Sequence, residues 1–429
     1  MPSRYALYVL GLMVGINLLN YMDRWVGSAV APLIQVEFDL SDFSIGLLGS
    51  AFTLVYALAA LPFGLWADRG SRRVVLGAGV LVWSLATLLT GLTRNFAQLF
   101  ATRAVLGIGE ASYFPAGTSL LGDYFPKESR GRAMAIWNAG SALGIAVGFA
   151  GGGYIAEQFG WRNAFFFAAV PGILFALLAF GLREPLRGSA ESRGPALKKT
   201  YDASLGNFLA LLRIPTLRAT ILSQTLLFFV LASNAFWLPL VLTRRFNLSV
   251  SKADLLAGVV LVAGGLIGTL AGGWIGDRRS LKNPAAHLHV GIAGFLFGAI
   301  FITIALVAPM NVGPVPVFVP AFFLAVVCLY LYYGPFTALS QSVVSPSLRA
   351  SAVTMLLFVS HVFGDSHSPF DVGFISDRVG SLQLALLITS PTLLILAAVI
   401  AATGLRTVQR DIQKMEDEWA ERPAALPVS

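Results

Sequence analysis

Long apolar stretches alternate with short polar segments along the whole chain. Each stretch holds about 20 mostly apolar residues, the length that an α-helix needs to cross the hydrocarbon core of a bilayer. The pattern predicts twelve membrane-spanning helices, over residues 7–34, 43–66, 74–93, 96–120, 132–156, 163–182, 217–242, 254–276, 286–308, 315–341, 350–376 and 382–404. The first stretch is too long for the apolar region of a signal peptide and lacks a small-residue cleavage site, so we interpret it as the first transmembrane helix.

Composition also places the chain among polytopic membrane proteins. Of its 429 residues, 56% are hydrophobic and 12% are charged, whereas soluble domains carry about 25% charged residues. The single cysteine, Cys328, excludes an internal disulfide, and four histidines are too few and too scattered for a typical zinc site. We therefore expect no metal and no cofactor. The net charge of +8 would suggest nucleic acid in a soluble protein, but here its distribution matters more than its sum, and we expect no nucleic-acid partner.

Most of the 30 lysine and arginine residues fall on one side of the predicted membrane. Clusters at 69–73, 127–132 and 278–282 lie in loops that alternate along the chain. Cytoplasmic loops of membrane proteins carry an excess of lysine and arginine. The asymmetry therefore predicts that both termini are cytoplasmic.

A polar linker divides the predicted helices into two sets of six. We expect an N-terminal bundle at 1–182, the linker at 183–215, a C-terminal bundle at 216–404 and a cytoplasmic tail at 405–429. Sequence landmarks recur in both halves. They are Gly64-Leu-Trp-Ala-Asp68-Arg69 and Gly273-Trp-Ile-Gly-Asp277-Arg278, which end helices two and eight, and Gly153-Tyr-Ile-Ala-Glu157 and Gly373-Phe-Ile-Ser-Asp377, which end helices five and eleven. Paired landmarks indicate an internal repeat, which is typical of secondary transporters.

The segment from Gly64 to Arg73, GLWADRGSRR, resembles a signature of the major facilitator superfamily, G-x-x-x-D-R-x-G-R-R. It departs from the signature in having Gly70-Ser71 where the pattern has x-G. The resemblance covers the whole chain and implies an all-α membrane protein. Its 12 transmembrane helices would form two pseudo-symmetric six-helix bundles around a central cavity, and it would transport its substrate by alternating access.

The resemblance places Asp68 beside the N-terminus of the eleventh helix and Asp277 beside that of the fifth. A helix N-terminus carries partial positive charge, which stabilises a neighbouring carboxylate. We interpret the two motifs as a conformational latch, made of Gly64, Asp68, Arg69, Arg72, Arg73, Asp277 and Arg278. Alternatively, Arg72 and Arg73 are ordinary positively charged anchors at the cytoplasmic surface.

Glycines recur at every fourth position in two of the predicted helices. The fifth carries Gly140, Gly144, Gly148 and Gly152, and the eighth carries Gly264, Gly268, Gly272 and Gly276. Such stripes allow close helix contact. In the superfamily these two helices meet between the halves, so we predict that the stripes form a smooth contact along which the halves rock. Static close packing is the alternative.

Four ionisable residues occupy the first and fourth predicted helices, where charge is costly. The first helix contains Asp23 and Arg24, and the fourth presents Arg103 and Glu110 along one face. Both helices line the central cavity in the superfamily. Because two acids and two bases balance, these side chains can form a neutral cluster.

We predict that this cluster binds the substrate. Arg24 would hold an anionic group, since its planar guanidinium suits phosphate or carboxylate. Asp23 and Glu110 would carry protons, because a substrate that occupies the arginine favours proton uptake by the acids. Arg103 is interpreted as mainly structural. The alternative is a fixed salt-bridge network that stabilises the first half.

The eleventh helix contains a second polar centre, HVFGDSHSP, which begins at His361. His361 and Asp365 share a face at i, i+4, and we predict both as further proton-coupling candidates. His367 and Asp371 share another face and alternatively lie in water near the outer end. Pro369 removes a backbone hydrogen bond and predicts a kink.

Two branches of the superfamily have similar residues in the first and fourth helices. One contains organic anion symporters for sugar acids and carboxylates, and the other is the spinster family, linked to lysophospholipids and sphingosine-1-phosphate. The eleventh helix resembles the spinster pattern H-x-x-G-D-x-x-S-P. This resemblance implies a bacterial-type homologue in the inner membrane, with an anionic amphiphile as substrate and protons and membrane lipids as partners. Trp237, Tyr330 and Tyr333 are predicted to contact the substrate, with core packing as the alternative, and we expect a monomer.

Other classes of function fit the sequence less well. The sequence contains no G-x-S-x-G motif, no H-E-x-x-H motif and no Walker loop. We therefore expect neither an enzyme nor an ATP-driven pump. A lipid scramblase or a ligand sensor on the same scaffold is the alternative from another class.

Overall fold

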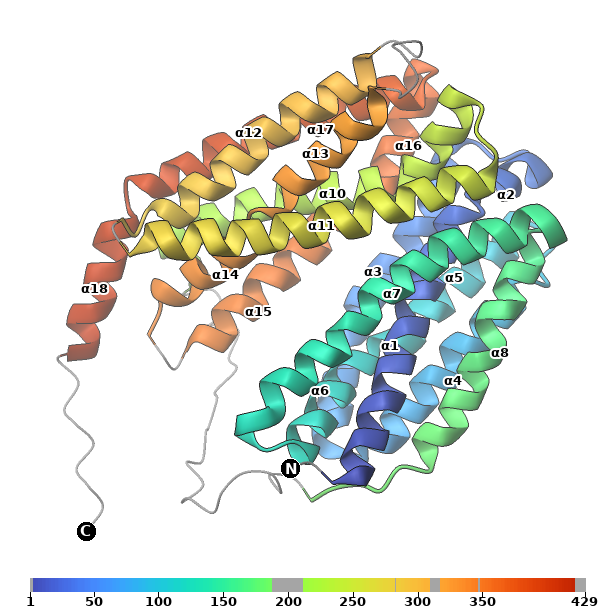
Figure 1. The fold of residues 1–429 in the computed structure, drawn as a ribbon, viewed down its shortest axis with the longest axis horizontal. Helices are drawn as coiled ribbons and strands as arrows, with labels where there is room; N and C mark the ends of the chain where they lie inside the picture. The colour runs from blue at the N-terminus through green and yellow to red at the C-terminus, as the bar shows by residue number, and fades with distance from the viewer. Residues whose placement is uncertain (1–2, 187–210, 282, 309–316, 346–347, 421–429) are drawn as a thin grey trace. The chain divides into compact units, whose positions relative to one another are not determined.

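The structure, a computed structural model, describes residues 3–186, 211–281, 283–308, 317–345 and 348–420 (Figure 1). The first six predicted spans correspond to α1 (Arg4–Ala29) with α2 (Ala31–Phe38), α3 (Asp42–Arg69), α4 (Arg72–Thr90), α5 (Phe96–Ala111) with α6 (Tyr113–Tyr124), α7 (Lys127–Phe159) and α8 (Trp161–Phe180). The other six correspond to α10 (Pro215–Phe246), α11 (Val250–Ser280), α12 (Ala286–Val307), α13 (Phe318–Tyr330) with α14 (Tyr333–Ser342), α15 (Arg349–Ser360) with α16 (Ser368–Val379), and α17 (Leu382–Leu405). A further helix, α18 (Val408–Ala420), lies in the predicted tail.

Each predicted span is helical, and several helices extend beyond the apolar stretch that predicted them. α7 has 33 residues and begins at Lys127, five positions before the predicted start. A helix of this length measures about 50 Å, more than the hydrocarbon core of about 30 Å. Hydropathy marks only the part of a helix that lies in hydrocarbon, whereas the backbone hydrogen bonds continue through the charged residues at its end.

Four of the predicted spans consist of two helices each, and two of these breaks lie beside predicted site residues. α5 and α6 meet at Ser112, whose hydroxyl donates to the carbonyl of Gly109 at 2.8 Å. Between α15 and α16, a π-helical segment covers His361–Asp365, and Pro369 lies in the first turn of α16, as the missing proline amide predicts. Ten segments within the described ranges are long and apolar enough to cross a membrane, and the spans of α5 with α6 and of α15 with α16 are the two predicted spans that are not among them.

Contacts between residues divide the chain into two compact units. The first comprises 1–198 with 235–262 and 366–382, and the second comprises 199–234, 263–365 and 383–429. The units therefore differ from the predicted bundles, because parts of α10, α11 and α16 pack with the first six helices. The linker marks the end of the first repeat in the sequence, but α10 and α11, with 32 and 31 residues, contribute residues to both units.

Within the first unit, α1 lies along α7 and α4 lies along α8 (Figure 1). Trp83 and Trp137 are fully buried, and the ring of Tyr113 contacts both, with centroids 6.0 and 5.5 Å away. This aromatic core joins α4, α6 and α7 around the first helix. It holds the helix that carries Asp23 and Arg24 in a fixed position.

The glycine stripe of α7 contacts α1 rather than α11. A Cβ on Gly144 would lie 2.3 Å from the carbonyl oxygen of Leu18, so only glycine permits this approach. In α11 a Cβ on Gly268 would lie 2.3 Å from the carbonyl oxygen of Val327 in α13. The other stripe glycines also face helices of their own unit: Gly140, Gly148 and Gly152 face α1, Gly264 and Gly272 face residues 323–331, and Gly276 faces Pro335 and His287. The prediction that the two stripes meet is wrong, because helical spacing identifies a glycine face but not the helix that covers it.

Candidate functional site

Arg24 and Glu110 form a direct ion pair between α1 and α5. The Nε atom of Arg24 donates to Oε2 of Glu110 at 2.7 Å. Glu110 is fully buried, whereas the side chain of Arg24 keeps 23% of its surface exposed. The side chain of Arg24 is therefore held by a buried acid and keeps part of its own surface exposed.

Three aromatic rings surround the same guanidinium. The Cζ atom of Arg24 lies 4.6 Å from the ring centroid of Tyr56, 5.1 Å from that of Tyr21 and 5.4 Å from that of Phe52. Aromatic faces attract cations, more strongly where water is excluded. These rings were not among the predicted site residues, although Phe52 and Tyr56 stand at i, i+4 on α3 and could have indicated an aromatic face.

Arg103 contacts the backbone of α1 rather than a carboxylate. Its Nη1 atom donates to the carbonyl of Asp23 at 3.4 Å, and its Cζ lies 5.4 Å from the ring centroid of Phe52. A Cβ on Gly27 would lie 3.0 Å from this guanidinium, so the glycine leaves room for it. These contacts agree with the structural role predicted for Arg103.

The structure brings all four predicted cluster residues together, with unequal pairing. Asp23 is 2% exposed. Among the described residues, Oδ1 of Asp23 and Oε1 of Glu110 are buried without a hydrogen-bond partner. Since buried polar atoms are normally paired, each of these oxygens is a place where a proton can bind.

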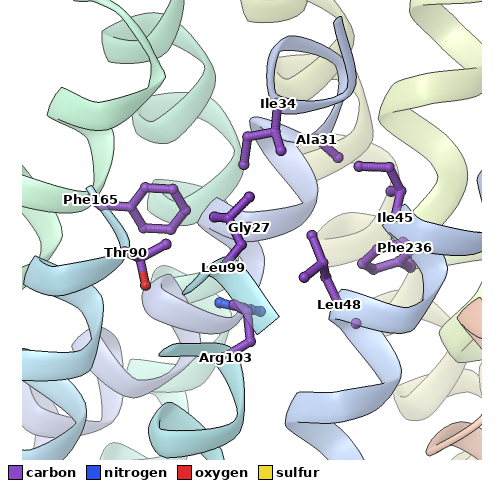
Figure 2. A pocket seen from close by; sticks show the side chains of 11 residues that line it. Gly27, Ala31, Ile34, Ile45, Leu48, Thr90, Leu99, Arg103, Phe165 and Phe236 are labelled. Carbon is purple, nitrogen blue, oxygen red and sulfur yellow. The ribbon is translucent and has the colours of Figure 1, made fainter. Parts of the chain in front are cut away.

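A small cavity borders Arg103 in the first unit (Figure 2). It is lined by Gly27, Ala31, Ile34, Ile45, Leu48, Gly49, Thr90, Leu99, Arg103, Phe165 and Phe236. Its volume of about 20 Å³ is room for about one water molecule. Arg103 supplies the charged group of an otherwise largely apolar wall, and the cavity is too small for a lipid.

The predicted pairs around the break before α16 both form. Nδ1 of His361 lies 2.6 Å from Oδ2 of Asp365, and Nδ1 of His367 lies 2.5 Å from Oδ2 of Asp371. The ring of Phe228 stands edge-on to His361 with centroids 5.1 Å apart. A π-helical turn carries the first pair, which is a common feature of functional sites in helices.

The aromatic residues proposed to contact the substrate differ in exposure. Trp237 is fully buried, and its indole N–H donates to the carbonyl of Pro369 at 3.2 Å. It therefore packs inside the first unit, as in the core-packing alternative. In the second unit Tyr330 is half-buried beside Gly265 and Tyr333 is 50% exposed.

Arg72 is a buried junction in the structure. It is 1% exposed, and its guanidinium contacts the carboxylates of Asp123 and Glu184, with 2.8 Å between Nε and Oε1 of Glu184. Nη2 also donates to the carbonyl of Pro185 at 2.7 Å. The neighbouring Arg73 donates to the carbonyl of Leu182 at 3.0 Å. The two arginines thus join the start of α4 to the end of α8, which goes beyond surface anchoring.

The pKa of Glu184 depends on its hydrogen bonds in this junction. Burial by itself would raise the pKa of the Glu184 carboxyl, but hydrogen bonds from Arg72, Arg73 and Ser71 hold it below its ordinary value of 4.5. The ionised form is therefore the stable partner of Arg72.

The remaining latch residues lie mostly at the surface. Arg69 and Asp277 are exposed, Gly64 has open space around it, and Arg278 lies over the ring of Trp274 at 4.9 Å. The side chain of Asp68 is outside the described part of the structure. The latch stays a prediction.

The acidic ends of α7 and α16 cap other helices. Asp377 accepts hydrogen bonds from the backbone amides of Asp42 and Phe43, both at 3.0 Å, at the N-terminus of α3. Glu157 accepts from the amide of Ser251 at 2.7 Å, at the N-terminus of α11. A carboxylate stabilises a helix N-terminus through these bonds and through the helix dipole. The paired landmarks of the sequence are thus paired caps in the structure.

Asp42 adds side-chain bonds to the first of these contacts. Its carboxylate accepts from Arg244 at 2.5 and 2.9 Å, from Ser376 at 2.6 Å and from Gln35 at 2.8 Å. We expect Asp42→Ala to loosen the packing of α3 against α16, because three donors lose their acceptor at once. Faster hydrogen exchange of the amides of 42–46 measures this effect. Asp39→Asn, at an exposed acid nearby whose left-handed backbone asparagine also tolerates, is the control, and equal exchange in both variants would contradict the expectation.

The fold and the charge cluster correspond to a known class of protein. Residues 13–364 match the family model described as Major Facilitator Superfamily, and the chain belongs to this superfamily of membrane transporters. It is 31% identical over 395 residues to "Protein spinster homolog 1" of Homo sapiens, a match that covers 88% of this chain and 74% of the relative. Within the superfamily, the chain is a spinster protein.

Two further comparisons agree with this assignment. The chain is 28% identical over 444 residues to "Probable sphingolipid transporter spinster homolog 3" of Arabidopsis thaliana, covering 92% of this chain and 84% of the relative. It is similar in structure to a bacterial homolog of the human lysosomal transporter Spinster, solved in an inward-facing and unoccupied conformation. The TM-score is 0.81 at 25% identity, covering 97% of this chain and 99% of the other. The protein is an integral, multi-pass membrane transporter.

Proposed function

We propose that the protein transports an anionic amphiphile of the lysophospholipid or sphingoid phosphate class by alternating access, linked to protons. The observation that carries this proposal is the partly exposed side chain of Arg24, paired with the buried Glu110. A guanidinium forms two parallel, charge-assisted hydrogen bonds with a phosphate. The Arabidopsis thaliana relative, which is named a probable sphingolipid transporter, supports the lipid class.

Proton coupling follows from competition for the same arginine. A phosphate that binds Arg24 replaces Glu110 as its partner. Glu110 is then a buried carboxylate without a cation, and burial favours its neutral form. Substrate binding thereby promotes proton uptake at Glu110, with Asp23 as a second acceptor and His361 and Asp365 as further candidates.

The surrounding arrangement is part of the proposal. Tyr330 and Tyr333 contact the apolar chain of the substrate. Asp68 and Asp277 form the latch at the cytoplasmic ends of α3 and α11. Both termini lie in the cytoplasm, the membrane is a bacterial inner membrane, and the protein acts as a monomer.

A binding and flux screen tests the substrate class. Purified protein is assayed for binding of lysophospholipids, sphingoid phosphates and sugar acids, and then for flux in proteoliposomes under an imposed gradient. Binding of sugar acids without lysolipids would identify an organic anion symporter instead. Equal flux of unrelated lipids would identify a scramblase, and binding without flux would identify a sensor.

Combined replacement of both cluster acids should flatten the pH dependence of transport. Asp23→Asn with Glu110→Gln keeps the volume of both side chains and removes both ionisable groups, so substrate binding no longer takes up a proton there. The measurement is the initial rate of flux across a pH series. Glu128→Gln, at the exposed start of α7, is the control. A wild-type pH profile in the double variant would move the coupling site to His361 or Asp365.

A further inference from the structure

In the first unit α7 packs against α1 and also against α11. We call the latter the α7–α11 contact. It consists of Phe149 with Gly258, Gly153 with Asp254, and Glu157 with Ser251. Residue numbers rise along one helix as they fall along the other, so the two helices run antiparallel. Within this contact, a Cβ on Gly153 would lie 2.1 Å from Oδ2 of Asp254. The absence of a side chain at Gly153 therefore provides the space for a carboxyl group.

Asp254 is fully buried in the α7–α11 contact. Within the described part of the chain, neither of its carboxyl oxygens has a hydrogen-bond partner, and it forms no ion pair. The charged group that acts on it from α7 is Glu157, which is another acid. On α11 the nearest charged side chain in sequence, Lys252, is exposed. An ionised carboxylate in these surroundings has no compensation for the loss of water, so the packed arrangement requires the neutral acid.

The cap that Glu157 forms at the N-terminus of α11 does not explain why position 254 holds an acid. Glu157 caps α11 at Ser251, three residues before Asp254. The equivalent cap, Asp377, binds α3 at Asp42 and Phe43. Three residues further along α3 stand Ile45 and Gly46, so the corresponding position holds no acid, and the acid of that contact, Asp42, is hydrogen-bonded to Arg244, Ser376 and Gln35. The packing of α7 against α11 therefore does not require an acid at position 254.

We propose that Asp254 is a proton-binding site that couples protonation to the packing of α7 against α11. With the helices packed, the carboxyl oxygen holds the proton. When the helices separate, water reaches the carboxyl, the O–H bond breaks and the proton passes to water. The site is separate from the Asp23–Glu110 cluster and needs no substrate to act.

The coupling has a definite sign. The packed arrangement binds one proton more than the separated one, so lower pH favours it and higher pH opens it. Over the range in which Asp254 is ionised only when exposed, the ratio of packed to separated molecules should fall about tenfold per pH unit. A transporter that changes conformation at this contact would then release a proton at each opening.

Distance measurements on substrate-free protein test the proposal. Spin labels are placed at the exposed positions 159 and 255, as Phe159→Cys and Leu255→Cys, in a Cys328→Ser background. We expect the short-distance population of the otherwise wild-type protein to fall as pH rises. With Asp254→Asn, which imitates the protonated acid, this population should stay high at every pH. If Asp254→Asn does not fold, Asp254→Leu, uncharged and similar in size, takes its place.

Glu157→Gln is the matched control, because it weakens the cap at Ser251 but leaves Asp254 in place. It should lower the packed population at every pH and retain the pH dependence. Distances that do not respond to pH in the wild type, or an unchanged pH response in Asp254→Asn, would overturn the proposal. Since no substrate is present, these outcomes are independent of whether Arg24 binds a lipid phosphate.

Discussion

Arg24→Ala is expected to abolish saturable binding and transport of a lysophospholipid or sphingoid phosphate. The variant removes the guanidinium of a partly exposed side chain in the cluster. Hydrogen bonds to charged groups contribute about 1.5–3 kcal/mol each, and two of them are lost. We therefore expect binding to weaken at least a hundredfold, measured by titration of the purified protein with the ligand.

Arg24→Lys separates charge from geometry. Lysine keeps the positive charge but cannot present two parallel donors to a phosphate. Binding should weaken about tenfold, because one charge-assisted hydrogen bond, about 1.5 kcal/mol at the low end, is lost. Arg94→Ala, at an exposed arginine outside the cluster, should bind as the wild type does.

The stability of the cluster requires its own control. Arg24→Ala leaves Glu110 buried without its partner, and such a change is itself destabilising. Arg24→Ala combined with Glu110→Gln removes both charges. A folded double variant that still fails to bind would assign the loss to ligand recognition. Normal lipid binding by Arg24→Ala would identify the cluster as the fixed salt-bridge network instead.

Arg72→Ala should cause the largest loss of stability among single substitutions at the described arginines. The side chain is 1% exposed and bonds to Asp123, Glu184, Ser119 and Pro185. Breaking a buried ion pair by removing one partner costs about 3–5 kcal/mol. We expect the lower end of this range, since the side chain of Glu184 is 30% exposed. A lower midpoint of thermal unfolding in detergent measures the effect.

The neighbouring arginine is the matched control for this variant. Arg73→Ala removes one side-chain hydrogen bond, to Leu182, and should shift the midpoint far less. Equal shifts would show that the buried pairs of Arg72 contribute little.

The effect of Arg72 should also depend on pH. Because the folded-state pKa of Glu184 lies below 4.5, its contribution to stability is present above that pH and is lost as the pH falls through the folded-state value. Wild type and Arg72→Ala should therefore converge in stability in acid.

The sequence by itself determined the helices and the main charge cluster. Apolar stretches of membrane length predict helices directly, because a bilayer leaves no other way to satisfy the backbone of a single span. Arg24 and Glu110 could be assigned to one neutral cluster with Asp23 and Arg103, since charges inside a membrane must find partners and only a few were available, but the structure identified the pair. The break before α16 could also be predicted, because Pro369 lacks the amide that would continue the helical hydrogen bonds.

Which neighbouring helix packs against each helix face became known from the three-dimensional structure. The stripe containing Gly144 contacts α1, Trp237 is buried against Pro369, and three aromatic rings surround Arg24. Asp254 gave no signal in the sequence, because its burial depends on Gly153, about 100 positions away. The periodicity of a helix shows which residues share a face. The identity of the neighbour is set by packing between helices, and that information is absent from any single segment.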